Sequence, residues 1–467
     1  MKKITILITV VIICLNCCRS YSQTFVVDTL LYNGDKNKLL NIVMMGDGYT
    51  SGEQAQFVTD ATNVKDYFFS QAPFSNYANY FNVFAIEVPS NESGANHPGT
   101  SADSDCPPVP VSTADNYFGS TFDSYGIHRL VCIQHYDSAS YVLTDNFPVY
   151  DIVLVIVNSP YYGGSGGYYA VSTTNVNSGD VSVHEIGHSF GDLADEYWSG
   201  SPWEAPNETQ DSDPSTIRWK NWLYDNGIGI YAFSEDNSWY RPHQGCKMRM
   251  LNVPFCSVCS ESLIEKIHSM VNPVYNYSPS NSSTLLADTA LLDFSLYLLQ
   301  PIPNTLKTEW ETDGILVSTN TDNYQIDPDT LVIGSHQVVA TITDTTVLTR
   351  SDDHWTTHIY NVTWNITKSL TGININTQMN STDILLYPNP FSDKLNISYH
   401  IDAETKVVIE IIDANGKIVK KVINKKQSAG NYELSLDAAE IGNIKGTNFI
   451  RFTFNNHIIV EPIMKLE

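Results

Sequence analysis

The feature that most constrains this 467-residue chain is the stretch at residues 183–198, VHEIGHSFGDLADEYW. It contains the pattern H-E-x-x-H at His184, Glu185 and His188. Residues four apart lie on the same face of a helix, so these two imidazoles can bind one metal ion and leave a position open for water. Glu185 can then reach that water and accept its proton. The pattern predicts a helix that carries a catalytic metal site.

The residues around the motif support a half-buried helix. Ser178 and Asp180 are candidate N-caps, and the apolar side of the helix would consist of Val183, Ile186 and Phe190. Gly187 costs a helix about 1 kcal/mol relative to alanine. Glycine at position 187 must therefore meet a requirement other than helix stability.

A third protein ligand must come from the carboxylates that follow, Asp192, Asp195 and Glu196. On a continued straight helix, Asp192 would lie about 6 Å further along the axis than His188 and could not converge on the same ion. The chain must bend, and we expect Gly191 to end the helix in a left-handed conformation. After the bend Asp195 and Glu196 point to opposite sides, so one can bind the metal while the other braces the loop.

The N-terminus predicts export. Lys2 and Lys3 precede a short apolar run, and Ser20 and Ser22 suit cleavage after residue 22. We interpret residues 1–22 as a secretory signal peptide, and we expect no transmembrane segment elsewhere. The chain has 26 basic and 51 acidic residues, and its net charge of −25 disfavours nucleic acid and anionic membranes as partners.

Removal of the signal peptide leaves Cys106, Cys132, Cys246, Cys256 and Cys259. Export permits disulfides. Cys256 and Cys259 form C-x-x-C, but a zinc ribbon needs a second such pair. We therefore expect Cys246 to pair with one of these two, and Cys106 to pair with Cys132, although connectivity cannot be read from sequence.

Hydrophobic patterns predict an α/β core. Buried strands are expected at residues 42–45, 82–88 and 151–157, and a helix at 57–68. The glycine-rich stretch 161–174 is either a mobile loop without a substrate role or the start of an edge strand at 168–173 that pairs with an extended peptide. We interpret Asp47, after the first of these strands, as part of a turn.

Two β-rich segments follow. A linker is predicted at 277–284, then a β-sandwich with strands at 292–296, 338–343 and 359–366. His354 and His358 are expected on its surface. A second small β-sandwich begins near residue 386.

The combined pattern resembles the IgA-peptidase family of secreted zinc metallopeptidases. The resemblance rests on GDGYT, PFSNYANYFNVFAIEVPSNESGA, HEIGHSFGDLADEYW and a C-x-M turn followed by FCSVC, over roughly residues 29–275. It implies one zinc ion held by His184, His188 and a carboxylate, with Glu185 as general base. The D-E-Y hallmark makes Asp195 the third ligand, and Glu196 is the runner-up.

The resemblance extends to metzincin peptidases, in which a methionine turn lies beneath the metal. Met248 would take that place, and Tyr240 is a candidate donor of a hydrogen bond to the transition state. The C-terminal segment resembles the sorting domain of the type IX secretion system, through YPNPF, DANGK and SAGNYELSL. That likeness implies export across an outer membrane by the type IX machinery, and a protein that is secreted or attached to the cell surface.

The predicted architecture is multidomain. It comprises the signal peptide (1–22), an α/β (α+β) metzincin-like zinc peptidase domain (23–275), an Ig-like β-sandwich (276–370), a linker (371–384) and a sorting domain with a second β-sandwich (385–467). The predicted function is a zinc endopeptidase in which zinc-bound water, activated by Glu185, hydrolyses protein or peptide substrates. The alternatives are a zinc amidase acting on cell-wall peptides and a surface adhesin with a structural metal site. Glu185 disfavours the adhesin, because a structural site needs no base.

Overall fold

The computed structural model describes residues 24–101, 103, 110–288, 290–369, 384–413, 416–441, 447–455 and 457–465. The chain forms two compact units, Met1–Lys368 and Ser369–Glu467. The predicted signal peptide, Cys106 and nearly all of the predicted linker at 371–384 lie outside the described residues. Among the described residues, no helix has both the length and the apolar character needed to cross a bilayer.

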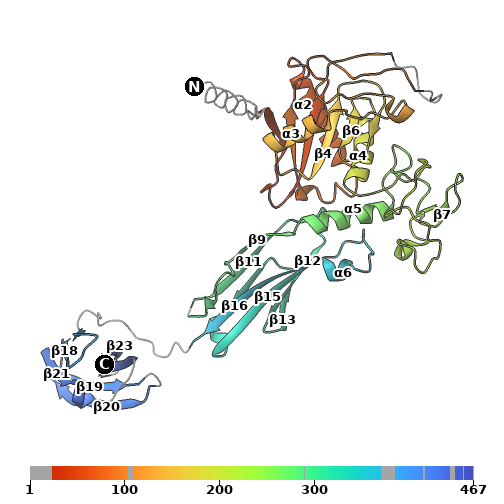
Figure 1. The fold of residues 1–467 in the computed structure, drawn as a ribbon. Helices are drawn as coiled ribbons and strands as arrows, with labels where there is room; N and C mark the ends of the chain where they lie inside the picture. Colours follow the sequence, from red (N-terminus) through yellow and green to blue (C-terminus); the bar gives the residue numbers. More distant parts are fainter. Residues whose placement is uncertain are drawn as a thin grey trace, which may run out of the picture. The chain divides into compact units, whose positions relative to one another are not determined.

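The first unit contains a six-stranded sheet in the order β1-β3-β2-β4-β6-β5 (Figure 1). Its strands are β1 (Val26–Leu31), β2 (Leu40–Asp47), β3 (Phe81–Glu87), β4 (Ile152–Val157), β5 (Gly164–Ser165) and β6 (Ala170–Thr173). The neighbours β3, β2, β4 and β6 are parallel, and β1 and β5 are antiparallel to theirs. The strands predicted at 42–45, 82–88 and 151–157 are β2, β3 and β4.

Helices cover both faces of this sheet, which explains why its central strands are apolar throughout. Ile42 and Met44 share a core with α2 (Gln54–Phe68) and α4 (Ser178–Ser189), whereas Val43 and Met45 face α3 (Tyr136–Asn146). The predicted buried positions of the first helix, Phe57, Ala61, Val64 and Phe68, are all buried in α2. The predicted α/β core is therefore present.

The prediction of an edge strand at 168–173 is wrong. Strand β6 lies between β4 and β5, so both of its sides are paired. On the outer side of β5, Gly164 bonds through its backbone to Arg129 and Val131. These contacts leave no free edge on β6 to which an extended peptide could add.

Asp47 at the end of β2 has a structural role that fits the turn interpretation. It is fully buried, and its two carboxylate oxygens accept hydrogen bonds from the backbone N–H groups of Phe118 (2.8 Å) and Ser120 (2.9 Å). The carboxylate thereby holds the loop that precedes α3.

The predicted N-caps of α4 are wrong. The cap residue is Asn177, without a side-chain hydrogen bond, and Ser178 and Asp180 already lie in the first turn. Asp180 instead forms a buried ion pair with Lys247 and accepts a hydrogen bond from the Tyr67 hydroxyl (2.7 Å). This pair joins the start of α4 to the Lys247–Met248 segment.

The remaining elements of this part are short, apart from α5 (Ser257–Met270). They are the 3-10 turns η1 (Ala78–Tyr80), η2 (Ser124–Gly126) and η3 (Lys220–Trp222), and the paired strands β7 (Tyr231–Ala232) and β8 (Tyr240–Arg241).

A β-sandwich completes the first unit. One sheet has the order β14-β11-β9 and the other β10-β16-β15-β12-β13. The strands are β9 (Val274–Ser278), β10 (Leu285–Leu286), β11 (Leu292–Leu298), β12 (Leu306–Thr312), β13 (Ile315–Thr319), β14 (Asn323–Ile326), β15 (Gly334–Asp344) and β16 (Ile359–Lys368), with the 3-10 turn η4 (Pro328–Thr330). The linker predicted at 277–284 is wrong in its first residues, because β9 pairs with β11.

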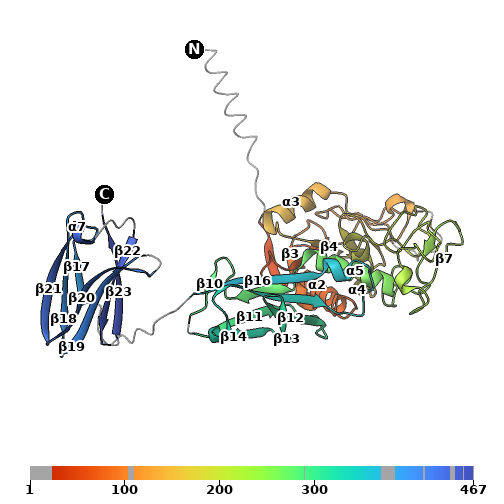
Figure 2. The ribbon, with the colours of Figure 1, turned by 90° about the horizontal axis from the view of Figure 1, so that it is seen from below.

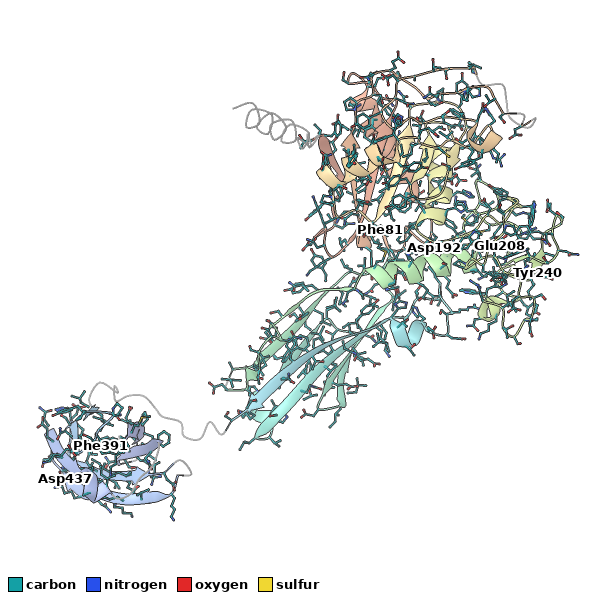
Figure 3. All side chains as sticks on the ribbon, viewed as in Figure 1. Phe81, Asp192, Glu208, Tyr240, Phe391 and Asp437 are labelled. Carbon is teal, nitrogen blue, oxygen red and sulfur yellow. The ribbon has the colours of Figure 1, made fainter. Side chains whose placement is uncertain are left out.

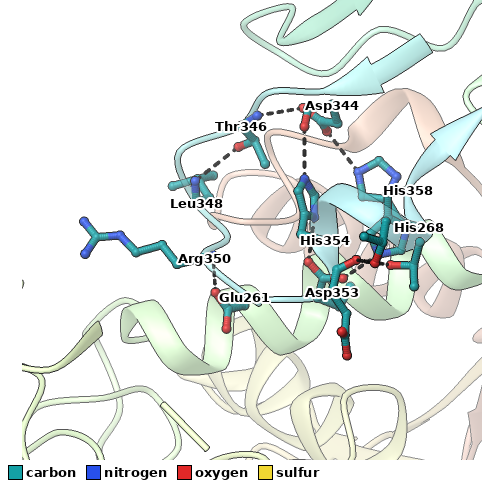
Figure 4. A network of polar contacts seen from close by, with 12 residues as sticks. Glu261, His268, Asp344, Thr346, Leu348, Arg350, Asp353, His354 and His358 are labelled. Carbon is teal, nitrogen blue, oxygen red and sulfur yellow. Dashed lines mark hydrogen bonds and ion pairs between the residues drawn. The ribbon is translucent and has the colours of Figure 1, made fainter. Parts of the chain in front are cut away.

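The sandwich is joined to α5 by a buried polar network (Figure 4). Asp344, at the end of β15, accepts hydrogen bonds from the Tyr77 hydroxyl (2.7 Å) and from His268 Nε2 of α5 (2.9 Å). His354 and His358, in and after the short helix α6 (His354–Thr357), both contact the Glu265 carboxylate of α5. The surface position expected for these two histidines is therefore wrong, since both are buried.

The second unit is a separate β-sandwich (Figure 2). One sheet has the order β17-β18-β21 and the other β20-β19-β22-β23, and both contribute to one apolar core. The elements are β17 (Ile384–Tyr387), β18 (Lys394–Ile401), β19 (Thr405–Ile412), β20 (Ile418–Gln427), β21 (Gly430–Asp437), α7 (Ala438–Ile441), β22 (Thr447–Phe454) and β23 (His457–Met464).

Candidate metal centre and active site

The structure brings His184, His188 and Asp195 to one point. Both histidines lie on α4, and the chain turns back after the helix so that one carboxylate oxygen reaches both rings. Asp195 Oδ1 lies 3.2 Å from His184 Nε2 and 3.3 Å from His188 Nε2, and the two Nε2 atoms are 3.2 Å apart.

This spacing fits a metal ion. Ligand atoms held about 2.0–2.1 Å from a tetrahedral ion stand roughly 3.3–3.4 Å from each other. Three nitrogen and oxygen atoms at 3.2–3.3 Å match that geometry, and they are the donor types that zinc accepts. The three residues therefore fit the ion that the sequence predicts.

Backbone carbonyls orient both imidazole rings. His184 Nδ1 lies 2.9 Å from the carbonyl oxygen of Lys247, and His188 Nδ1 lies 2.7 Å from that of Leu193. A carbonyl can only accept, so each Nδ1 carries the proton and each Nε2 is left with its lone pair. This is the arrangement by which proteins direct histidine toward a metal.

The electrostatics of the metal-free site also favour a cation. Burial opposes protonation of His184, but Asp195 and Glu185 outweigh it and raise its pKa to about 9. Burial favours the protonated form of Asp195, yet hydrogen bonds with His184 and His188 lower its pKa below the ordinary value. The ligand set thus attracts positive charge, which protons supply when no metal is bound.

Glu185 lies on the same helix beside the ligand atoms and lines the same cavity. Burial raises its pKa, and the neighbouring imidazoles His184 and His188 act in the opposite direction. A carboxyl group whose pKa is moved toward neutrality can both accept and return a proton.

The bend after α4 forms differently from the prediction. The residue in the left-handed conformation is Asp192 (φ 53°), and not Gly191. Gly191 is needed for close packing instead, because a Cβ there would lie 2.6 Å from Leu263 Cδ2 of α5. Asp192 itself lines the cavity and forms an ion pair with Lys266 Nζ at 3.4 Å, and it is not part of the cluster of candidate ligands.

Met248 explains the glycine inside the helix. Its side chain is fully buried beneath α4, and a Cβ at position 187 would lie 2.8 Å from Met248 Sδ. Gly187 therefore lets the methionine approach the helix between the two histidines.

Two glycines of the 161–174 stretch also allow close packing against α4. A Cβ at Gly166 would lie 2.7 Å from His188 Cβ, and one at Gly164 would lie 2.6 Å from Val181 Cγ1 and 3.2 Å from Glu185 Oε1. At these two positions the stretch packs closely against α4.

The side chains of Asp195 and Glu196 lie on different sides of the chain. Glu196 is fully buried on the other side of the chain, where its Oε1 lies 3.1 Å from Cys259 Sγ and 3.7 Å from Cys256 Sγ. Its backbone N–H donates to the carbonyl of Met248 (2.7 Å).

The metal ligands line a cavity of about 920 Å³. Tyr240 is not among its lining residues; it lies in β8, and in the view of Figure 3 Glu208 lies between it and Asp192. The tyrosine beside the candidate ligands is Tyr197, which follows the D-E pair and hydrogen-bonds Asp195.

Arg129, Tyr197 and Glu208 are among the lining residues that sequence reasoning missed. Burial raises the pKa of Glu208 to about 7, and Asp195 adds to this effect. Tyr197 could have been found from the D-E-Y hallmark, but Arg129 and Glu208 lie in irregular segments that carry no motif.

Two family models match parts of the chain. The family model described as IgA Peptidase M64 matches residues 29–228, and that of the Secretion system C-terminal sorting domain matches residues 385–465. The two matches confirm the resemblances to the IgA-peptidase family and to the type IX sorting domain. The first indicates a peptidase, and the second indicates export across the outer membrane.

Comparisons with individual proteins add little. No curated protein matches the chain. Among solved structures, the chain is similar to fibronectin(III)-like modules of Clostridium thermocellum CbhA (12% identity, TM-score 0.14, 20% of this chain and 94% of that chain). It is also similar to dimeric latent PorU from Porphyromonas gingivalis (13%, 0.15, 41% and 20%) and Bacteroides uniformis beta-glucuronidase 3 (8%, 0.15, 49% and 28%). At these TM-scores, none of the three bears on the fold or function of this chain.

Proposed function

We propose that this protein is an exported zinc endopeptidase of metzincin-like architecture. The observation that carries the proposal is the convergence of His184 Nε2, His188 Nε2 and Asp195 Oδ1 within 3.3 Å of one another at the wall of a cavity that Glu185 also lines. The buried Met248 beneath α4 supports the metzincin-like part of the proposal.

His184, His188 and Asp195 would hold the ion, with Nε2 of each ring directed by its Nδ1 hydrogen bond. A zinc ion at this place supplies a Lewis acid that polarises a peptide carbonyl and lowers the pKa of water. The three protein ligands leave a fourth position open, which distinguishes a catalytic site from a closed structural one.

Glu185 acts as the general base. It accepts the proton of the attacking water and donates it to the leaving amine, a role that fits a buried carboxyl group beside two imidazoles. Tyr197 replaces Tyr240 as the candidate donor to the oxygen that becomes negative in the transition state. Its hydroxyl interacts with Asp195 and Arg129, and its ring lines the cavity.

The test combines metal analysis with hydrolysis. Glu185→Gln keeps the shape and the three ligands but removes the proton acceptor, so we expect near-normal zinc content and at least ~100-fold lower activity on a peptide library. Asp195→Ala should release zinc to a competing chelator far more readily than Asp192→Ala, the matched control. Substantial activity in the Glu185→Gln protein would contradict the assigned base.

A digest of protein substrate against a digest of peptidoglycan separates the endopeptidase from a cell-wall amidase. Zinc at the site without hydrolysis of either polymer would instead favour the adhesin.

A further inference from the structure

A second cluster of metal-ligating groups lies next to the candidate active site. It consists of Glu196, Cys246, Cys256 and Cys259, whose ligand atoms all lie within 4.8 Å of one another. All four residues are buried, and Glu196, Cys246 and Cys259 are fully so. The three cysteines are free thiols in the structure, so the disulfide expected between Cys246 and one of the other two is absent.

Two of three distances within this cluster match a tetrahedral site, and the third, between Glu196 Oε1 and Cys259 Sγ, is shorter. Around one zinc ion, sulfur ligands at about 2.3 Å and an oxygen ligand at about 2.0 Å lie roughly 3.5–3.8 Å apart. Cys246 Sγ lies 3.6 Å from Cys259 Sγ, and Glu196 Oε1 lies 3.7 Å from Cys256 Sγ and 3.1 Å from Cys259 Sγ. A disulfide would need a sulfur–sulfur distance of about 2.05 Å.

Two further observations indicate that this cluster suits a cation. Glu196 Oε2 is buried without a hydrogen-bond partner, and Oε1 receives only a long bond of 3.3 Å from Asn207 besides the thiols. A buried carboxylate in such surroundings is costly unless a positive charge compensates it. In addition, the backbone N–H of Cys256 points to Cys246 Sγ at 3.3 Å, a contact that stabilises a thiolate.

We propose that Glu196, Cys246, Cys256 and Cys259 form a second metal site that binds zinc. Four protein ligands close the coordination sphere, so the ion has a structural role. Binding deprotonates the three thiols and releases their protons to solvent. The sulfur-rich ligand set distinguishes this site from the nitrogen and oxygen ligands that would hold the ion of the catalytic centre.

The position of the second site explains what it would do. Glu196 directly follows Asp195, and Cys246 directly precedes Lys247, whose carbonyl orients His184. A metal ion that ties Glu196 to Cys246 therefore fixes the chain on both sides of the catalytic ligands. The hydrogen bond from Glu196 N–H to the Met248 carbonyl runs between the same two segments.

Two other clusters do not support such a site. In the cluster of Glu265, His354 and His358, the carboxylate already binds both rings, and His354 Nε2 also contacts the Asp344 carbonyl. In the cluster of His97, Asp123 and His128, Asp123 is bonded by His128 and by the backbone N–H groups of Thr100 and Ser101.

The first test needs no variant. The intact chain is stripped of metal under reducing conditions and titrated with Co²⁺ while its absorption spectrum is recorded. Thiolate ligands give a strong sulfur-to-cobalt charge-transfer band in the near ultraviolet, which the ligands His184, His188 and Asp195 cannot give. We expect this band, and its absence would overturn the proposal.

The second test counts zinc. The His184→Ala/His188→Ala protein should retain one tightly bound zinc ion per chain, and Cys256→Ser/Cys259→Ser added to it should remove that ion. Cys132→Ser is the matched control, because Cys132 is a free, half-buried thiol outside the cluster; it should leave the zinc content unchanged.

Peptide mapping of the untreated protein shows whether these cysteines form a disulfide instead of binding a metal ion. A disulfide between Cys246 and either Cys256 or Cys259 in the active protein would refute the site. These results are independent of the peptidase proposal, since zinc bound by thiolates does not require hydrolysis, and hydrolysis does not require that zinc.

Discussion

Replacement of Glu265 by glutamine tests whether the sandwich is an integral part of the catalytic unit. Glu265 lies on α5, and its carboxylate contacts His354 Nδ1 (2.8 Å) and His358 Nε2. Glutamine keeps the size and shape of the side chain but removes the negative charge. The variant therefore removes the ionic part of this contact and little else.

The expected magnitude follows from the pKa. Burial favours the protonated form of Glu265, but hydrogen bonds with His354 and His358 outweigh it and lower the pKa from 4.5 to about 2. A difference of about 2.5 pKa units corresponds to roughly 3 kcal/mol. The side chain is 25% exposed, so solvent screens this interaction only in part.

The contributions of Glu265 and His354 to stability depend on pH in opposite directions. Because the folded pKa of Glu265 is depressed, its contribution is present above about pH 4.5 and is lost as the pH falls toward 2. Burial opposes protonation of His354, but Glu265 raises its pKa, so its contribution is complete below about pH 6.5 and is lost as the pH rises through the folded pKa. The substitution should be most destabilising between about pH 4.5 and 6.5.

The assay is urea unfolding of the intact chain, followed by the fluorescence of the buried Trp310 and Trp364 of the sandwich. At pH 5.5, Glu265→Gln should lower the free energy of unfolding by about 3 kcal/mol relative to wild type, and at pH 3 by much less. Glu311→Gln, a half-buried glutamate of β12, is the matched control. A loss below about 1 kcal/mol at pH 5.5, or an equal loss at both pH values, would refute the reasoning.

Two substitutions test the packing around the candidate metal centre, and one truncation tests the contribution of the sandwich. Gly187→Ala places a Cβ 2.8 Å from Met248 Sδ. Overpacking of about 1–3 kcal/mol should outweigh the gain in helix stability of about 1 kcal/mol. Urea unfolding should therefore show a net loss of stability, which the additional substitution Met248→Ala should relieve. Gly166→Ala places a Cβ 2.7 Å from His188 Cβ and should weaken zinc binding in competition with a chelator, whereas Gly52→Ala, with open space around it, should not. A chain ended after Tyr275 lacks Asp344, the acceptor for Tyr77 and His268, and should unfold at lower urea than a chain ended after Lys368; equal stability would contradict this.

Regular elements with a strong pattern were predictable from the sequence. The strands β2, β3 and β4 are apolar on both faces, and α2 places Phe57, Ala61, Val64 and Phe68 on one side, so local burial and local sequence agree. The spacing of His184 and His188 likewise predicts their proximity, because a helix brings residues four apart together.

Features that depend on tertiary contacts were not predictable. Gly191 was expected to adopt the left-handed conformation, but packing against Leu263 requires a glycine there and Asp192 takes the strained position. The burial of His354 depends on Glu265, 89 residues away. Similarly, the sequence showed no partner pair for C-x-x-C. The groups that lie near it in the fold, Cys246 and Glu196, are separated from it along the chain.

Helix α5 has a consequence for the order in which the molecule is completed. Its Leu263 and Ser262 contact Gly191 directly after the metal helix, and its last turns hold His268 for Asp344. A chain that has emerged from the ribosome only through residue 300 already contains H-E-x-x-H, yet it lacks the acceptor shared by Tyr77 and His268. The contacts that β15 and α6 make with this helix therefore form only once these later elements are present. The complete anchoring of α5 therefore needs residues that lie far beyond the motif in the sequence.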